Sequence, residues 1–188
     1  MQAPVIPTDW PNRNASRHVF CAPHLWHVQE IGSGPTLLMI HGAGGASHSW
    51  RGLVPVLADH YHLVIVDLPG QGFTRLGARH RCGLDPMAED LARLIRQEAW
   101  APMAYIGHSA GAAIALRLAE LAPPRAVIGL NAALGQFEGA AHGRVFAVDR
   151  FMTRHTSQAG VHLGQHMCAG RLGLWALLHG GRLICWTA

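Results

Sequence analysis

The chain has 188 residues, of which 49% are hydrophobic, and a formal net charge of +4 from 15 Lys and Arg against 11 Asp and Glu. This length allows one substantial buried core and favours a single domain. The arginines are scattered along the chain, without a basic stripe interleaved with aromatic residues. The composition therefore argues against a nucleic-acid-binding protein.

The spacing of the cysteines and the length of the apolar segments indicate where in the cell the protein is expected. No C-x-x-C spacing or paired pattern links the four cysteines, which argues against a zinc ribbon, a redox dithiol or a disulfide framework; they are Cys21, Cys82, Cys168 and Cys185. Residues 1–17 contain three prolines and Asp9 but no apolar run typical of a signal peptide. The apolar stretch 172–186 is too short to span a bilayer. We expect a cytoplasmic protein without a transmembrane segment.

Strand and helix patterns alternate through the first 130 residues. Continuous or alternating apolar runs predict strands, and apolar residues at three- and four-residue spacing predict helices. The expected strands are 25–31, 36–40, 62–66, 102–106 and 126–130, and the expected helices are 50–58, 84–95 and 112–122. Asp85 is the expected N-cap of the second helix, with Pro86 at its first position. This order predicts an α/β fold with a mostly parallel sheet and flanking helices.

The pattern deteriorates after Asn131. Residues 150–188 contain no Asp or Glu, and no Val/Ile-rich strand is recognisable among them. We therefore expect residues 1–148 to form the amino-terminal part of an α/β domain, truncated after the strand at 126–130. Residues 149–188 are expected to be a divergent tail or a frameshift product.

One pentapeptide points to chemistry. Gly107-His108-Ser109-Ala110-Gly111 follows a predicted strand and precedes a predicted helix, which is the context that a G-x-S-x-G nucleophile elbow requires. The elbow predicts a strained turn that exposes the Ser109 hydroxyl as a nucleophile. The glycines are expected because side chains there would collide where strand and helix cross. The backbone N–H of Ala110 is the expected first donor of an oxyanion hole.

A glycine-rich loop supplies the expected second donor. His41-Gly42-Ala43-Gly44-Gly45 ends the strand 36–40, and the N–H of Ala43 is the best candidate. His41 and Gly42, together with His108, are expected to line the pocket. Both this loop and the elbow follow the carboxyl ends of parallel strands, where open α/β sheets bind ligands.

The base and the acid of a catalytic triad are not identifiable. The order known for this elbow is Ser, then Asp or Glu, then His. The acids downstream of Ser109 are Glu120, Glu138 and Asp149, and the histidines are His142, His155, His162, His166 and His179. The sequence shows none of these histidines with a late strand before it and a helix after it. His162 and His166 have a metal-compatible spacing but no third ligand, so neither a metal nor another cofactor is predicted.

Three further residues have two interpretations each. Asp67 could orient a catalytic base, but the following Pro69-Gly70-Gln71-Gly72 favours a role in its own turn. Trp26 and Trp50 could line a pocket for a flat ligand or belong to the core.

Several segments together resemble one family within the α/β-hydrolase fold. They are Trp10-Pro11-Asn12-Arg13, Trp26-His27-Val28-Gln29, His48-Ser49-Trp50-Arg51, the segment 67–74, the elbow with Ala112 and Ala113, and Asn131-Ala132-Ala133-Leu134. Over residues 10 to 140 the chain is similar to the magnesium-chelatase accessory proteins of bacteriochlorophyll biosynthesis. The resemblance implies a role near magnesium insertion into protoporphyrin, with a tetrapyrrole or a magnesium-chelatase subunit as partner. Ser109, Ala110 and Ala43 carry over as site residues.

Three hypotheses follow for function. The chain is an accessory or binding protein of pigment synthesis, a serine hydrolase of an ester or related acyl bond, or a truncated and inactive fragment. Without a triad base, Ser109 would be an ordinary alcohol, so this polypeptide alone is expected to have negligible hydrolase activity.

Overall fold

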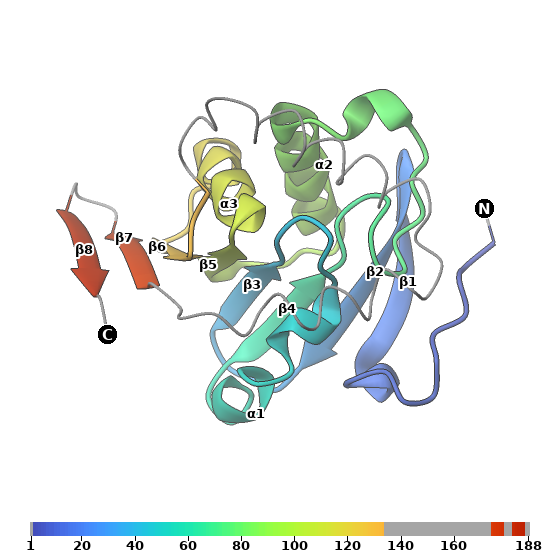
Figure 1. The fold of residues 1–188 in the computed structure, drawn as a ribbon, viewed down its shortest axis with the longest axis horizontal. Coiled ribbons are helices and arrows are strands. Elements are labelled where there is room, and N and C mark those ends of the chain that lie inside the picture. The colour runs from blue at the N-terminus through green and yellow to red at the C-terminus, as the bar shows by residue number, and fades with distance from the viewer. Residues whose placement is uncertain (1, 134–173, 179–181, 187–188) are drawn as a thin grey trace, which may run out of the picture.

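The computed structural model describes residues 2–133 and the strands 174–178 and 182–186. An eight-stranded sheet has the strand order β1-β2-β4-β3-β5-β6-β7-β8 (Figure 1). The strands are β1 (Ser16–Cys21), β2 (His24–Ile31), β3 (Thr36–Ile40), β4 (His62–Val66), β5 (Pro102–His108), β6 (Ala126–Leu130), β7 (Leu174–Leu178) and β8 (Arg182–Trp186). The helices are η1 (Arg13–Ala15), η2 (Ser47–Trp50), α1 (Val54–Leu57), η3 (Arg79–Arg81), α2 (Leu84–Gln97) and α3 (Ala110–Leu121).

The four central strands are parallel, as the sequence predicts. β3 pairs in parallel with β4 and with β5, and β5 pairs in parallel with β6. Ile40 is level with Val66 on one side and with Gly107 on the other. The segments that follow these three residues therefore emerge side by side at the carboxyl edge of the sheet.

Helices cover both faces of this sheet. α2 and α3 lie on one face and α1 on the other (Figure 1). Alternate strand residues pack in opposite directions, since the side-chain period of a strand is two. One cluster joins Leu38, Ile40, Val64, Val66, Tyr105 and Val127 to α2 and α3, and the other joins Leu37, Met39, Leu63, Ile65, Ala104 and Ile106 to Trp50 and Val54. The strand runs are continuously apolar because both faces are covered.

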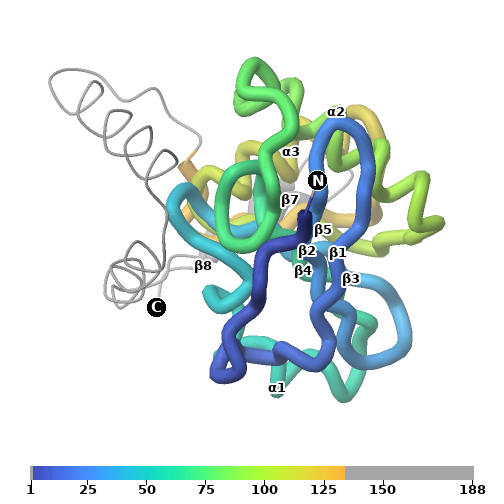
Figure 2. The backbone as a smooth tube through the Cα atoms, turned by 90° about the vertical axis from the view of Figure 1, so that its right-hand side faces the viewer, coloured from blue at the N-terminus to red at the C-terminus, as the bar shows by residue number. Residues whose placement is uncertain are grey.

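The amino-terminal lead ends in a strand that the sequence analysis missed. β1 pairs antiparallel with β2, and β2 pairs antiparallel with β4. In Figure 2 the dark-blue lead passes over the edge of the sheet that β1 forms. β1 was missed because it is an edge strand whose burial is mixed, so its sequence lacks an apolar run.

Two helix predictions were wrong in detail. The predicted helix 50–58 consists of η2 and the four-residue α1. The N-cap of α2 is Gly83 instead of Asp85, which lies inside the helix. The carboxylate of Asp85 accepts a hydrogen bond from Nε of Arg117 at 2.7 Å. The Asp85 side chain, which was expected to cap α2, thus forms an ion pair with α3 instead.

The sheet continues beyond the predicted truncation. β7 pairs antiparallel with β6, and β8 pairs antiparallel with β7. The sequence analysis recognised no Val/Ile-rich strand in this part of the chain, and the truncation itself stays a prediction. These strands are rich in Leu and Trp instead of Val and Ile, so a search for Val/Ile-rich runs does not find them. The division at residue 148 itself stays a prediction.

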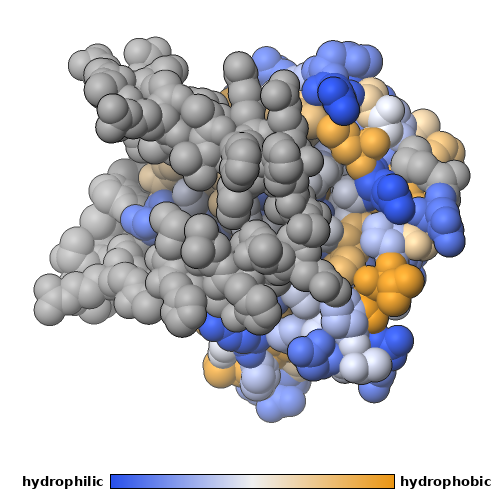
Figure 3. All heavy atoms as spheres, turned by 45° about the vertical axis from the view of Figure 1, so that its right-hand side comes forward, coloured by the Kyte–Doolittle hydropathy of each residue, from blue (hydrophilic) through white to orange (hydrophobic). Residues whose placement is uncertain are grey.

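Large exposed apolar side chains come from separate segments of the surface. Val5 lies in the lead, Phe20 in β1, Val56 in α1 and Leu84 in α2. On the face shown in Figure 3, small orange areas alternate with blue ones among the described residues. In the part of the chain that the structure describes, no helix is long and apolar enough to cross a membrane.

Candidate functional site

Ser109 lies at a strained corner between β5 and α3. Its backbone has φ 51° and ψ −118°, a combination that costs a residue with a side chain on the order of 1–3 kcal/mol. The surrounding backbone holds it there. The N–H of Ser109 donates to Leu130 O at 3.0 Å, and its carbonyl accepts from Ala112 N at 3.0 Å and Ala133 N at 3.2 Å. This is the strand-turn-helix geometry expected of a nucleophile elbow.

Both elbow glycines occupy positions without room for a side chain. A Cβ on Gly107 would lie 2.5 Å from the Ala112 backbone, and one on Gly111 would lie 2.2 Å from Ile40 O. α3 therefore crosses β5 and β3 at backbone contact. The steric reason inferred from the sequence for these glycines is confirmed.

The loop after β3 approaches the elbow closely. A Cβ on Gly42 would lie 3.0 Å from both Ser109 Cβ and His108 Nδ1. Within the described residues, the backbone N–H groups of Ala43 and Ala110 have no hydrogen-bond acceptor. Ala43 is exposed, and Ser109 and Ala110 are half-buried. The two expected oxyanion donors therefore belong to adjoining segments beside Ser109, and their role stays a prediction.

His41 holds the base of this loop. It is fully buried, its Nδ1–H donates to Gly42 O at 2.7 Å, and its Nε2 accepts the N–H of Leu68 at 2.9 Å. Burial lowers the pKa of His41 below its ordinary value, so the ring is neutral. His108 is half-buried, and burial lowers its pKa as well. His41 thus supports the loop from below the surface, and the His108 ring lies next to Gly42 of the loop.

Two more hydrogen bonds fasten the same loop to the turn after β4. The N–H of Gly44 donates to Gln71 Oε1 at 2.7 Å, and the N–H of Ser47 donates to Asp67 Oδ1 at 2.6 Å. Together with the hydrogen bond between Leu68 and His41, they attach the loop at positions 41, 44 and 47, which are three residues apart. The two segments form one hydrogen-bonded unit at the carboxyl edge of the sheet.

Asp67 is the centre of that unit. Its Oδ2 accepts the N–H of Phe73 at 2.8 Å, and its carbonyl accepts the hydroxyl of Thr74 at 2.7 Å. A Cβ on Gly72, whose φ is +51°, would lie 2.1 Å from the carboxylate. The interpretation that Asp67 organises its own turn is confirmed.

Asp67 has a partner that the sequence analysis missed. His27, from β2, donates its Nδ1–H to Asp67 Oδ2 at 2.7 Å, and both side chains are fully buried. Burial alone would raise the pKa of Asp67, but the hydrogen bonds from His27 and Phe73 lower it overall. Three buried polar residues in β2, which are His24, His27 and Gln29, were the available signal.

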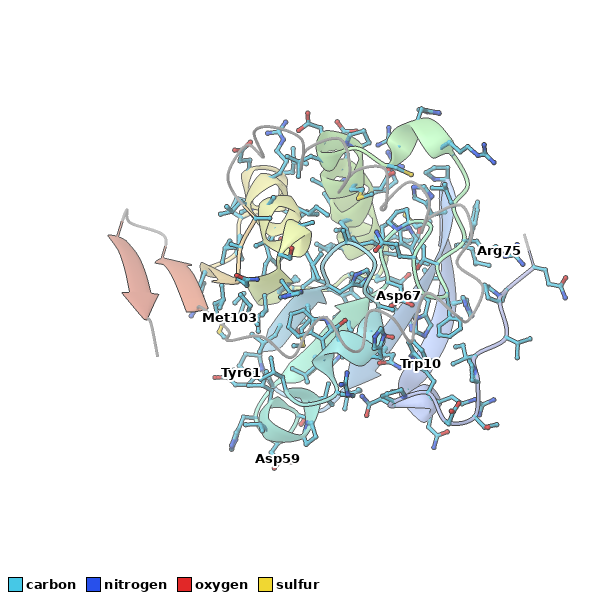
Figure 4. The ribbon with its side chains drawn as sticks, in the orientation of Figure 1. Trp10, Asp59, Tyr61, Asp67, Arg75 and Met103 are labelled. Carbon is cyan, nitrogen blue, oxygen red and sulfur yellow. The ribbon has the colours of Figure 1, made fainter. Side chains whose placement is uncertain are left out.

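The amino-terminal lead also contributes to the site's support. The indole N–H of Trp10 donates to Ser47 Oγ at 3.1 Å, and its ring packs edge-on against His48 and Phe73. Figure 4 shows Trp10 near Asp67 in the body of the molecule, while Arg75 points outward. Trp26 and Trp50 are buried in the two core clusters, which confirms their structural interpretation.

Among the residues that the structure describes, no triad base or acid is identified downstream of Ser109. Glu120 is exposed on α3 and pairs with Arg117. The other downstream acids and all five downstream histidines lie outside the described residues. Among the described residues, no group of three or more His, Cys, Asp or Glu side chains could hold a metal ion.

A surface hollow of about 660 Å³ lies at the opposite edge of the sheet. Thr36, Trp100, Pro102 and Arg125 contribute to its lining. Thr36 and Pro102 begin β3 and β5, whereas the loop and the elbow follow the far ends of these strands. The hollow is therefore separate from the candidate site.

Comparison with known proteins agrees with this geometry. The sequence model of the alpha/beta hydrolase fold family matches residues 35–153. The chain belongs to the alpha/beta hydrolase fold family. A candidate lipase from Acinetobacter baumannii AYE superimposes with a TM-score of 0.66 at 22% identity, covering 89% of this chain and 67% of that one. At this identity the likeness shows the fold alone.

Two relatives of this alpha/beta hydrolase fold protein carry functional names. The magnesium-chelatase 30 kDa subunit of Rhodobacter capsulatus is 47% identical over 148 residues, which are 78% of this chain and 52% of the relative. The pimeloyl-[acyl-carrier protein] methyl ester esterase of Aeromonas hydrophila is 35% identical over 98 residues, which are 52% of this chain and 37% of the relative. The chain thus spans about half the length of the first relative and less of the second.

Proposed function

We propose that this alpha/beta hydrolase fold protein is an accessory protein of magnesium chelatase in (bacterio)chlorophyll synthesis. The observation that carries the proposal is the 47% identity over 148 residues to the magnesium-chelatase 30 kDa subunit of Rhodobacter capsulatus. The aligned portion includes more than the general features of the fold, because the similarity extends over 78% of this chain. The expected partner is a chelatase subunit or a tetrapyrrole, in the cytoplasm.

The proposal can be tested with purified components. Magnesium insertion into protoporphyrin by the chelatase subunits is followed by product fluorescence with and without the chain. In parallel, protoporphyrin and magnesium protoporphyrin are titrated into the chain. We expect a faster insertion rate or saturable binding of one component. The pimeloyl-[acyl-carrier protein] methyl ester esterase serves as a control of related fold. Equal results for the two proteins in both assays would contradict the proposal.

A second candidate function is acyl transfer at Ser109. The observation that favours it is the strained backbone of Ser109 beside two N–H groups without acceptors, those of Ala43 and Ala110. In this role the Ser109 oxygen attacks an ester carbonyl as its hydroxyl loses the proton, and the two N–H groups stabilise the carbonyl oxygen that becomes negative. The ester C–O bond then breaks, which leaves an acyl-serine and releases the alcohol with the proton. The 35% identity to a methyl ester esterase supports the same class of reaction.

This candidate predicts covalent labelling of Ser109 by an alkyl fluorophosphonate. The exchange Ser109→Ala should abolish labelling, whereas Ser33→Ala, at an exposed turn position, should leave it unchanged. Mass spectrometry of the labelled peptide identifies the site. Labelling of the unchanged protein that persists in Ser109→Ala would exclude Ser109 as the nucleophile.

A further inference from the structure

We infer that Gln71 is a positioning residue that holds the loop 41–45 in the form that leaves the Ala43 N–H free for a developing oxyanion. The inference rests on the acyl-transfer function proposed for Ser109. It goes further because it assigns a role to a side chain outside the G-x-S-x-G motif and outside the loop itself.

The hydrogen bonds of consecutive loop amides carry the inference. The N–H of Gly44 donates to Gln71 Oε1 at 2.7 Å, and that of Gly45 donates to Gly42 O at 3.0 Å. Only the N–H of Ala43, among the amides of residues 43–45, has no acceptor in the described part of the chain. One loop N–H is therefore satisfied within the loop and one by Gln71, and a single one is presented to a ligand.

Gln71 is itself held in place. Gln71 is buried, with only 6% of the residue exposed. Its backbone N–H donates to Leu68 O at 2.9 Å, and its carbonyl accepts from Thr74 N at 3.1 Å. Gln71 thus belongs to a buried turn and offers a fixed acceptor to the more accessible loop.

Removing the Gln71 acceptor should change the conformation of the loop 41–45 more than it changes the overall fold. The Gly44 N–H would be left without a protein partner in a half-buried position, and Gly44, at φ +72°, has the backbone freedom to rotate. A rotation there moves the neighbouring peptide of Ala43. Misplacement of a catalytic group by about 1 Å can cost roughly 100-fold in rate.

The test compares three glutamine variants. Gln71→Met removes the acceptor at similar length, and Gln71→Glu keeps an oxygen at the same position. Gln97→Met is the matched control, since among the described residues the Gln97 amide bonds to Phe20 O and Glu98 on the exposed side of α2. The readouts are the rate constant for fluorophosphonate labelling of Ser109 and hydrogen exchange at the Gly44 amide.

We expect Gln71→Met to slow labelling by about 10- to 100-fold and to accelerate exchange at Gly44. Gln71→Glu should stay close to the unchanged protein in both readouts, and so should Gln97→Met. Faster exchange with unchanged labelling would overturn the inference, as would equal loss in Gln71→Glu. If the unchanged protein is not labelled at all, the acyl-transfer function fails first and the role of Gln71 with it.

Discussion

The Asp67 carboxylate accepts a hydrogen bond from His27 Nδ1 at 2.7 Å, although the two residues are 40 positions apart and both are fully buried. The same carboxylate accepts the N–H groups of Ser47 and Phe73. β2, the loop after β3 and the turn after β4 therefore meet at one charged group. A buried charge of this kind is tolerated because three hydrogen-bond donors surround the carboxylate.

We predict that Asp67→Asn destabilises the protein by about 3 kcal/mol, because an amide cannot accept from all three donors. The control is Asp59→Asn at an exposed position after α1, far from Asp67 in Figure 4. It should change the free energy of unfolding by less than about 0.5 kcal/mol. Urea denaturation followed by circular dichroism measures both. Similar midpoints for the two variants would contradict a central role for Asp67.

The elbow glycines give a prediction with an internal control. In Gly111→Ala the new Cβ would meet Ile40 O at 2.2 Å, whereas at Gly52 nothing lies within 4 Å. Displacing two backbone segments costs on the order of 3 kcal/mol or more. We expect Gly111→Ala to lower the melting temperature strongly or to prevent folding. Gly52→Ala should leave it nearly unchanged, and comparable losses in both variants would argue against the steric explanation.

The sequence predicted the central sheet well because its strands are buried on both faces. β3, β4 and β6 match the expected ranges, since continuous apolar runs bounded by glycine and polar residues leave little ambiguity. The elbow was equally clear, because only glycine fits where α3 crosses the sheet. β1 was missed because an edge strand has one partner and carries no comparable apolar pattern.

The hydrogen bonds that support the candidate site could not be predicted from the sequence in the same way. The contacts of His27 with Asp67 and of Trp10 with Ser47 join residues 40 and 37 positions apart. A local pattern does not encode such pairings, because they depend on how the loops stack at the sheet edge. Asp85 shows the reverse case, in which tertiary pairing with Arg117 replaced a locally favoured cap.

Strain at Ser109 gives a third prediction. At φ 51° and ψ −118°, glycine is favoured and any residue with a Cβ is strained. We expect Ser109→Gly to be about 1 kcal/mol more stable than Ser109→Ala, because relief of strain exceeds the entropy that glycine adds to the unfolded chain. Thermal unfolding of both variants tests this order. An alanine variant that is equally stable would show that the turn imposes no strain.

Five buried or half-buried histidines give a fourth prediction, which concerns pH. Burial is the leading cause that lowers the pKa values of His18, His24, His41, His48 and His108 below the ordinary value of 6.5. Below that value the unfolded chain binds protons that the folded chain does not, so the free energy of unfolding falls as the pH falls. Asp67, whose pKa is lowered, adds a separate loss only below about pH 3.8. Denaturation midpoints should therefore decrease between pH 7 and pH 5.

His48 allows the pH effect to be assigned. It is 3% exposed, its Nδ1 has no hydrogen-bond partner in the described structure, and its ring packs edge-on against Trp10. Burial is the main cause of its lowered pKa; His41 and Arg51 lower it further, and Asp67 opposes them. His48→Phe keeps an aromatic ring while removing the group that binds a proton on unfolding. We expect this variant to gain stability relative to the unchanged protein as the pH falls from 8 to 5, by up to about 1 kcal/mol. The exposed His60→Gln should show no such gain, and a parallel pH profile for all three proteins would mean that burial of His48 is not what couples folding to protons.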